Sequence, residues 1–131
     1  MADKMSFSLV SPERKLADGE ADMVVIPGME GDLGALPGHA PFLTTLRPGL
    51  VVVTNGSETT EYFVTGGFAE VSDEGAAVLA EEARERAEVS ADWLNEKIAA
   101  AETALEAAGD ESRQAAGQRL DDFRAVAQQL A

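Results

Sequence analysis

The chain has 131 residues, of which 45% are apolar and only 5% aromatic, enough for one domain with a core of its own, with or without a small appendage. Its formal net charge of −14 repels phosphate backbones and anionic lipid headgroups, so we expect no nucleic-acid partner and no direct insertion into a membrane. Cysteine is absent, which excludes disulfides, thiol nucleophiles and iron–sulfur clusters.

The N-terminal segment, residues 1–10, is too short and too polar for a signal peptide. No apolar run approaches the ~20 residues that a membrane-spanning helix needs. The chain is therefore expected to be a soluble, cytoplasmic protein. If it works at a membrane, other proteins have to hold it there.

Residues 1–86 contain all five prolines and ten of the twelve glycines, spaced among short apolar runs, a pattern typical of strands and turns. Phe7 and Leu9 alternate with serines, as expected of a strand with one buried face. Residues 23–26 are continuously apolar, which suits a strand covered on both faces. Many short strands with frequent turns predict an antiparallel β-sandwich or barrel.

Two β-hairpins are predicted within this part. Asn55-Gly56 lies between the apolar runs 50–54 and 62–64, and Asn-Gly is the pair that a type I′ turn prefers because both central residues need positive φ. Residues 68–71 and 76–80 flank an Asp-Glu-Gly turn, which predicts the second hairpin.

From about residue 90 the composition changes to Ala, Glu and Gln, without proline. Apolar residues recur every three or four positions in two stripes, one at Leu94, Ile98, Ala101 and Leu105, the other at Leu120, Phe123, Ala127 and Leu130. Gly109 suits a helix C′ position and Asp110 the next N-cap, which predicts antiparallel helices at about 90–107 and 111–130. The stripes are narrow and rich in alanine, so this hairpin buries little apolar surface and is marginally stable by itself. The predicted fold class is α+β, with an antiparallel sandwich at 1–86 and a two-helix arm at 90–131.

Residues with catalytic potential form no recognisable constellation. His39 is the single histidine, so a zinc site would depend on carboxylates. In its Pro-Gly-His-Ala-Pro turn we expect it either to hydrogen-bond nearby backbone or to be a contact residue on an exposed loop. The glycine clusters at 27–32 and 66–67 lack the spacing and the lysine of a P-loop. No metal, no cofactor and no enzymatic activity are predicted.

Residues 31–49 read GDLGALPGHAPFLTTLRPG. This segment resembles the signature of ATP synthase epsilon subunits, G-[ED]-[LM]-G-x-x-P-G-H-A-P-x-[LV]-T-x-[LI]-[KR]-P-G. Residues 66–71, GGFAEV, followed by 78–81, VLAE, are similar to a second block of that family, and the V-S-P at 10–12 suits it as well. The resemblance covers about residues 5–86 in sequence, and the rest of the chain in architecture.

The resemblance implies a non-catalytic subunit of the rotating central stalk of a bacterial F-type ATP synthase, in the same family as the mitochondrial delta subunit. In that family the sandwich binds the gamma subunit and stands on the ring of c subunits, so the chain would be held peripherally at the cytoplasmic face of the inner membrane. The match places Glu30, Gly31 and Asp32 on the loop that meets the c ring, with His39 on the neighbouring turn. An acidic Asp32 facing a basic ring loop would set orientation more than affinity.

The arm departs from the family in its charge. In many relatives it extends along gamma and blocks ATP hydrolysis, with basic residues set against an acidic motif of the catalytic beta subunit. From residue 90 onward this chain has four basic residues against eight acidic ones. The resemblance therefore implies an arm that inhibits weakly here.

Some relatives bind ATP through an [IL]-D-x-x-R-A motif at the start of the first helix. Here these letters occur at 120–125, in the second predicted helix, which indicates a coincidental match. The alternative is a free-standing nucleotide sensor in which Asp121 and Arg124 hold ATP. A third interpretation is an adaptor that binds peptides by edge-strand addition. Neither alternative accounts for residues 31–49.

Overall fold

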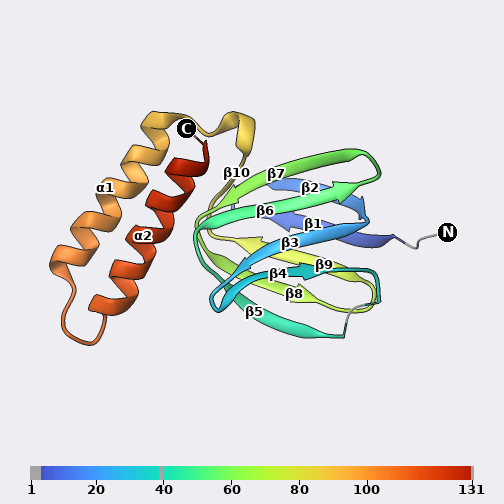
Figure 1. The fold of residues 1–131 in the computed structure, drawn as a ribbon, viewed down its shortest axis with the longest axis horizontal. Coiled ribbons are helices and arrows are strands. Elements are labelled where there is room, and N and C mark those ends of the chain that lie inside the picture. The colour runs from blue at the N-terminus through green and yellow to red at the C-terminus, as the bar shows by residue number, and fades with distance from the viewer. Residues whose placement is uncertain (1–3, 39, 131) are drawn as a thin grey trace. The chain divides into compact units, whose positions relative to one another are not determined.

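The computed structural model describes residues 4–38 and 40–130. The chain divides into two compact units, Met1–Arg86 and Ala87–Ala131. The first is built from strands and the second from helices (Figure 1), which confirms the predicted α+β class.

Ten strands form the first unit within the described residues. They are β1 (Met5–Val10), β2 (Lys15–Ala21), β3 (Met23–Gly28), β4 (Gly31–Ala35), β5 (Phe42–Leu46), β6 (Gly49–Asn55), β7 (Glu58–Val64), β8 (Gly67–Val71), β9 (Gly75–Ala80) and β10 (Ala83–Glu85). Their order is β10-β7-β6-β3-β5-β8-β9-β1-β2, and β4 pairs with β3 outside this path.

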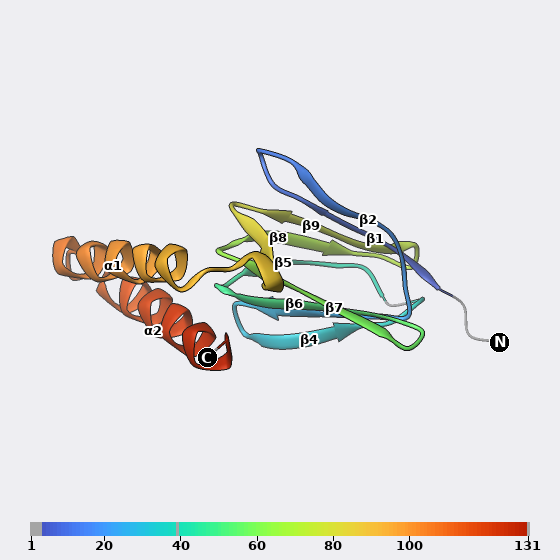
Figure 2. The same cartoon turned by 90° about the horizontal axis from the view of Figure 1, so that it is seen from above.

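The strands fold into a sandwich with two layers. Figure 2 shows β5, β8, β9, β1 and β2 in one layer and β4, β6 and β7 in the other. The layers are joined at one side, where Gly28 of β3 pairs with Leu46 of β5. Within the part of the chain that the structure describes, the strand pairings are antiparallel except that of β1 with β9, which is parallel.

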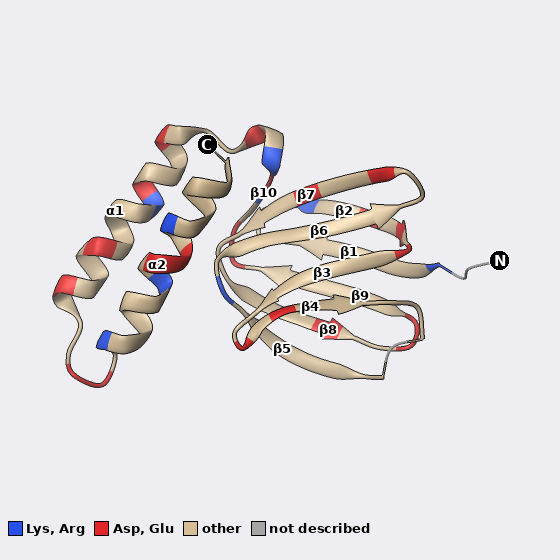
Figure 3. Cartoon of the chain, in the orientation of Figure 1, with Lys and Arg blue, Asp and Glu red and all other residues tan. Residues whose placement is uncertain are grey.

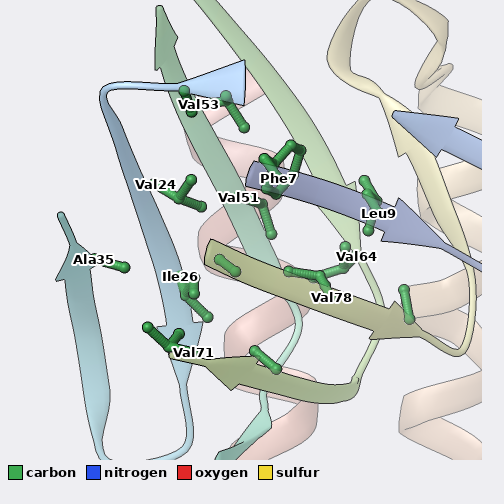
Figure 4. Close-up of a cluster of buried hydrophobic side chains, with 14 of the residues drawn as sticks. Phe7, Leu9, Val24, Ile26, Ala35, Val51, Val53, Val64, Val71 and Val78 are labelled. Carbon is green, nitrogen blue, oxygen red and sulfur yellow. The ribbon is translucent and has the colours of Figure 1, made fainter. Parts of the chain in front are cut away.

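The core lies between the two layers and follows from alternation along the strands. In β1, Met5, Phe7 and Leu9 are buried and the two serines between them are not, as the sequence predicts. Figure 4 shows the Phe7 and Leu9 side chains among valines of the neighbouring strands and Ile26. Burying one such side chain contributes roughly 1.5–3 kcal/mol, so this cluster stabilises the sandwich without the helices. β3 differs from the prediction: Val24 and Ile26 are buried, but Met23 and Val25 are half-buried, because only one face of β3 meets the core.

The hairpin of β6 and β7 has a different turn from the predicted one. β6 runs through Asn55 and β7 begins at Glu58, so Gly56 and Ser57 are the central residues. Gly56 has φ +64°, and no described residue other than glycine has positive φ. This is the pattern of a type II′ turn, with glycine first, because the strand register places Asn55 in the ladder.

The second unit contains the 3₁₀ turn η1 (Arg86–Glu88), shared with the first, and the helices α1 (Ala91–Ala107) and α2 (Arg113–Leu130). Ser90 caps α1 by accepting the backbone N–H of Trp93 at 3.1 Å. The predicted boundary between the helices is wrong by two residues. Gly109 does not adopt positive φ, and Ser112, whose carbonyl accepts the Ala116 N–H, stands where Asp110 was expected.

Within the described residues, no helix combines the length and the apolar character needed to cross a membrane.

Candidate interaction surfaces

The β3–β4 turn projects from the sandwich and contains three of the four residues expected at the c ring. Met29 and Glu30 are exposed, and Gly31 begins β4 with φ +134°, a conformation that favours glycine. The Met29 side chain is apolar, yet 53% of this residue is exposed to solvent. Among the described residues, Glu30 has no ion-pair partner.

Arg47 holds this turn from the start of the β5–β6 connection. Its Nη2 donates to the Asp32 carboxylate at 2.9 Å, and its Nε donates to the Gly28 carbonyl at 3.1 Å. Its backbone N–H also donates to the Pro27 carbonyl at 3.0 Å. The Asp32 carboxylate is thus already paired within the chain, while 63% of its side chain stays exposed. Glu30 therefore carries the uncompensated charge of the turn.

Pro37 and Gly38, which precede His39 in the chain, follow the other end of β4. Gly38 has φ +80°, and His39 itself lies outside the described residues. The five residues of β4 separate this segment from the β3–β4 turn by about 15 Å, at ~3.3 Å per residue. Pro37 and Gly38 therefore do not form one compact surface with the β3–β4 turn, although the two segments are close in the sequence.

The outward face of β5, β8 and β9 carries three large, exposed apolar side chains. Leu43, Phe68 and Leu79 are 68%, 54% and 57% exposed. Phe68 is the register partner of Leu79 across β8 and β9, and Leu43 lies on the next strand opposite Glu70. Three large apolar side chains are thus gathered on one sheet surface, which we call the outer face. Such a patch marks an interaction surface more often than a freely solvated one.

The two residues considered for nucleotide binding lie on α2. Asp121 is exposed, and the Nη2 of Arg124 donates to the Glu102 carboxylate of α1 at 3.1 Å. The adjacent Asp122 is buried and accepts a hydrogen bond from Gln118 at 3.0 Å. The arginine that would meet a phosphate is therefore engaged between the helices.

Among the described residues of the sandwich, two have shifted pKa values. Lys4, at 2.8 Å from the Asp22 carboxylate, and the Gly56 backbone N–H, at 2.6 Å, lower the pKa of Asp22. Burial raises the pKa of Tyr62, and the nearby Glu85 adds to that shift. In the part of the chain that the structure describes, no three His, Cys, Asp or Glu side chains gather as metal ligands would.

Residues 4–86 match the family model described as the beta-sandwich domain of the ATP synthase delta/epsilon chain. This chain belongs to the ATP synthase epsilon chain family. The epsilon chain of Rhodobacter capsulatus is 50% identical over 126 residues, covering 96% of each chain. That of Ruegeria sp. (strain TM1040) is 52% identical over 112 residues, covering 86% of this chain and 82% of its own. The family resemblance expected from residues 31–49 and 66–81 is confirmed, and with it a non-catalytic ATP synthase subunit rather than an enzyme.

Solved structures show the same fold at lower identity. A chain in the mitochondrial ATP synthase of Euglena gracilis, solved with its OSCP, F1 and c-ring, superposes with a TM-score of 0.76 at 22% identity, covering 98% of this chain and 82% of its own. A chain in the central stalk and c-ring structure of Tetrahymena thermophila gives a TM-score of 0.58 at 24% identity, covering 70% and 73%.

Several epsilon-chain signature residues have a structural role in this chain. A Cβ on Gly49 would lie 2.8 Å from the Cβ of Pro27, and a Cβ on Gly67 would lie 2.0 Å from the carbonyl oxygen of Leu79. Both positions therefore require glycine for close packing. The outer face, in contrast, was not predicted. Its only signal in the sequence is a large apolar residue at a position that strand periodicity assigns to solvent. Leu79 is an example, because it stands between the buried Val78 and Ala80.

Proposed function

We propose that this epsilon-family chain is a central-stalk subunit of a bacterial proton-translocating F-type ATP synthase, which couples rotation of the c ring to the catalytic head through gamma. The complex holds the chain peripherally at the cytoplasmic face of the inner membrane. Its two contact surfaces are the outer face, toward gamma, and the β3–β4 turn, toward the c ring.

The outer face is the observation that carries this proposal. Leu43, Phe68 and Leu79 lie on a paired, rigid sheet, so their positions are fixed before a partner arrives. A preformed surface loses little conformational entropy when a partner binds. Such a surface suits a rotor subunit, which has to transmit torque. A few anchor side chains in the desolvated centre of an interface contribute most of its binding energy, and Phe68 is the aromatic candidate for that role here.

The β3–β4 turn fits a polar partner. It presents Glu30 as a free carboxylate and Asp32 as one that Arg47 already holds. Exposed ion pairs contribute ~1 kcal/mol or less, so this turn sets the register against a basic loop and adds little affinity. His39, the fourth residue expected at the c ring, stays a prediction, since it lies outside the described residues.

The alternative of a free-standing nucleotide sensor has less support. Arg124 pairs with Glu102, and an ATP phosphate would have to displace that carboxylate.

The test of the outer face is the affinity of the chain for F1 depleted of its epsilon subunit. Phe68→Ser should weaken binding at least about tenfold, because a central aromatic side chain contributes ~1.4 kcal/mol or more. Leu36→Ser is the matched control, since Leu36 is 53% exposed but lies on the β4–β5 connection and not on β5, β8 or β9. If both variants lose affinity for F1 equally, or if neither loses affinity, the assignment of this face to gamma is contradicted.

A further inference from the structure

One edge of the sandwich is open. β2 pairs with β1 along its length, and among the described residues no strand pairs with its other edge. Asp18, Gly19 and Glu20, in the middle of β2, are all exposed. At the far end of the strand order, β10 covers β7 only at Tyr62–Val64. We call the space between β2 and the uncovered first half of β7 the seam.

The backbone of β2 has free hydrogen-bonding groups at the seam. Ser6 of β1 donates its backbone N–H to the Glu74 carbonyl at 3.0 Å, so its polar groups face away from β2. In an antiparallel pair, two residues that do not bond each other both point their backbone groups outward. Glu20, the register partner of Ser6, and Asp18, two residues earlier, therefore present N–H and C=O groups to the seam.

A cavity of about 270 Å³ opens into the seam, lined among others by Phe7, Ala17, Gly19 and Tyr62. Gly19 is the register partner of buried Phe7, and its lack of a side chain leaves this space. A Cβ on Gly19 would have no atom within 4 Å. At about 30 Å³ per water molecule, the cavity has room for a side chain from outside.

The rim of the cavity is acidic. Asp18, Glu20 and Glu58 line it, and Lys15 pairs with Asp18 at 3.1 Å. Nearby Glu61 is paired with Arg86 at 2.7 Å. Glu20 and Glu58 are thus left without an ion-pair partner among the described residues, which favours a positively charged occupant.

From these observations we propose that the open edge of β2 binds an extended, basic segment of a protein partner as an added strand. The backbone groups of Asp18 and Glu20 pair with the segment, and one of its apolar side chains enters the cavity beside Gly19. This is strand addition at a sheet edge, in which backbone hydrogen bonds give affinity and a side-chain pocket gives selectivity. The site is separate from the outer face and from the β3–β4 turn, and it does not depend on the stalk function.

The probe is an acetylated, amidated heptapeptide that alternates lysine and valine, titrated into the full-length ¹⁵N-labelled chain at low salt. We expect amide shifts concentrated at Asp18 and Glu20, weaker binding at higher salt, and no binding of the analogue that alternates glutamate and valine. Gly19→Val fills the cavity and should weaken binding at least tenfold without lowering the melting temperature. Gly34→Val is the matched control on another strand, where a Cβ meets only the Met23 sulfur at 3.9 Å.

Glu20→Pro removes both the outward N–H and the carboxylate, and proline is tolerated at a strand edge. Glu20→Gln removes the charge alone, so Glu20→Pro should weaken binding more than Glu20→Gln does. Equal binding of the acidic peptide, undiminished binding by Gly19→Val, or shifts spread away from β2 would overturn the proposal. An absence of binding would overturn it as well. The acidic side chains of Asp18 and Glu20, together with Gly19, would then serve to keep this edge from pairing with other strands. Assembly of Gly19→Val into the ATP synthase reports on the stalk function independently.

Discussion

Gly66 and Gly67 show how single residues determine this sandwich. Both have positive φ, +152° and +127°, at the start of β8, where the strand passes close to β9. A Cβ at position 67 would lie 2.0 Å from the Leu79 carbonyl oxygen and 2.9 Å from the Cα of Ala80. Neither backbone atom can move without breaking the pairing of β8 with β9.

Gly67→Ala is therefore expected to lower the free energy of unfolding by ~2–4 kcal/mol, from combined backbone strain and overlap. Gly34→Ala is the control, because its Cβ has room and its φ is ordinary, and it should change stability by less than ~1 kcal/mol. Urea denaturation of the two variants decides the matter. Similar midpoints for both would show that β8 and β9 separate more easily than their pairing indicates.

Asp22 links stability to pH. Its pKa is lowered in the folded chain by Lys4 and by the Gly56 N–H, whereas the unfolded carboxyl titrates at about 3.9. A lowered folded pKa contributes stability that is fully present above the unfolded pKa and is lost as pH falls through the folded pKa. Lys4→Met removes the first of these causes. The melting-temperature difference between wild type and Lys4→Met should be constant from pH 5 to 7 and should shrink below pH 4. A difference that grows on acidification would contradict this linkage.

At the scale of elements, contacts within the helical arm engage most of its basic residues. Arg124 pairs with Glu102 across the helices, and the Arg119 guanidinium lies 5.1 Å from the centroid of the Phe123 ring. The two helices differ in charge (Figure 3): α1 has four acidic residues and one basic residue, whereas α2 has two acidic and three basic residues. Lys97 likewise lies 5.1 Å from the centroid of the Trp93 ring. Arg113 is thus the one basic residue of the arm outside these contacts, among the described residues.

Deleting residues 90–131 should therefore change ATP hydrolysis by the assembled complex less than about twofold. An arm favours its extended state only through differential affinity, and a tenfold shift needs ~1.4 kcal/mol. The assay compares the truncated chain with full-length Arg113→Ala, which removes the cation outside these contacts. A several-fold rise on deletion, with a partial rise in Arg113→Ala, would show that arginine placement outweighs the net charge of the arm.

The elements that sequence reasoning found are those with a clear period. β1, with Phe7 and Leu9 inward, and the hairpin of β8 and β9 follow directly from alternation and turn residues. β2, with the sequence KLADGEA, was not predicted, because an edge strand needs no buried face and so shows no alternation. The start of α2 was misplaced because Asp110 and Ser112 both suit an N-cap, and only the geometry of the loop selects between them.

At the scale of the whole molecule, the sequence predicts the family better than the contact surfaces. The signature at 31–49 is sufficient to name the family, but Leu43 within it is exposed only because of the register of β5 on β8. Likewise the distance along β4, which separates the β3–β4 turn from Pro37 and Gly38, is not visible in a linear motif. Surfaces arise from strand pairings between distant residues, which periodicity alone does not specify.

The net charge of −14 acts on the same scale, because it favours basic surfaces on every partner. The central claim is that this chain is held in an ATP synthase stalk by gamma and the c ring. It is tested most directly by capturing the tagged chain from membranes in mild detergent and quantifying what accompanies it. We predict that gamma and c subunits co-purify with the chain and that removing gamma releases it from the membrane. Capture without these subunits, or a chain that stays on lipid after gamma is stripped, would contradict the account.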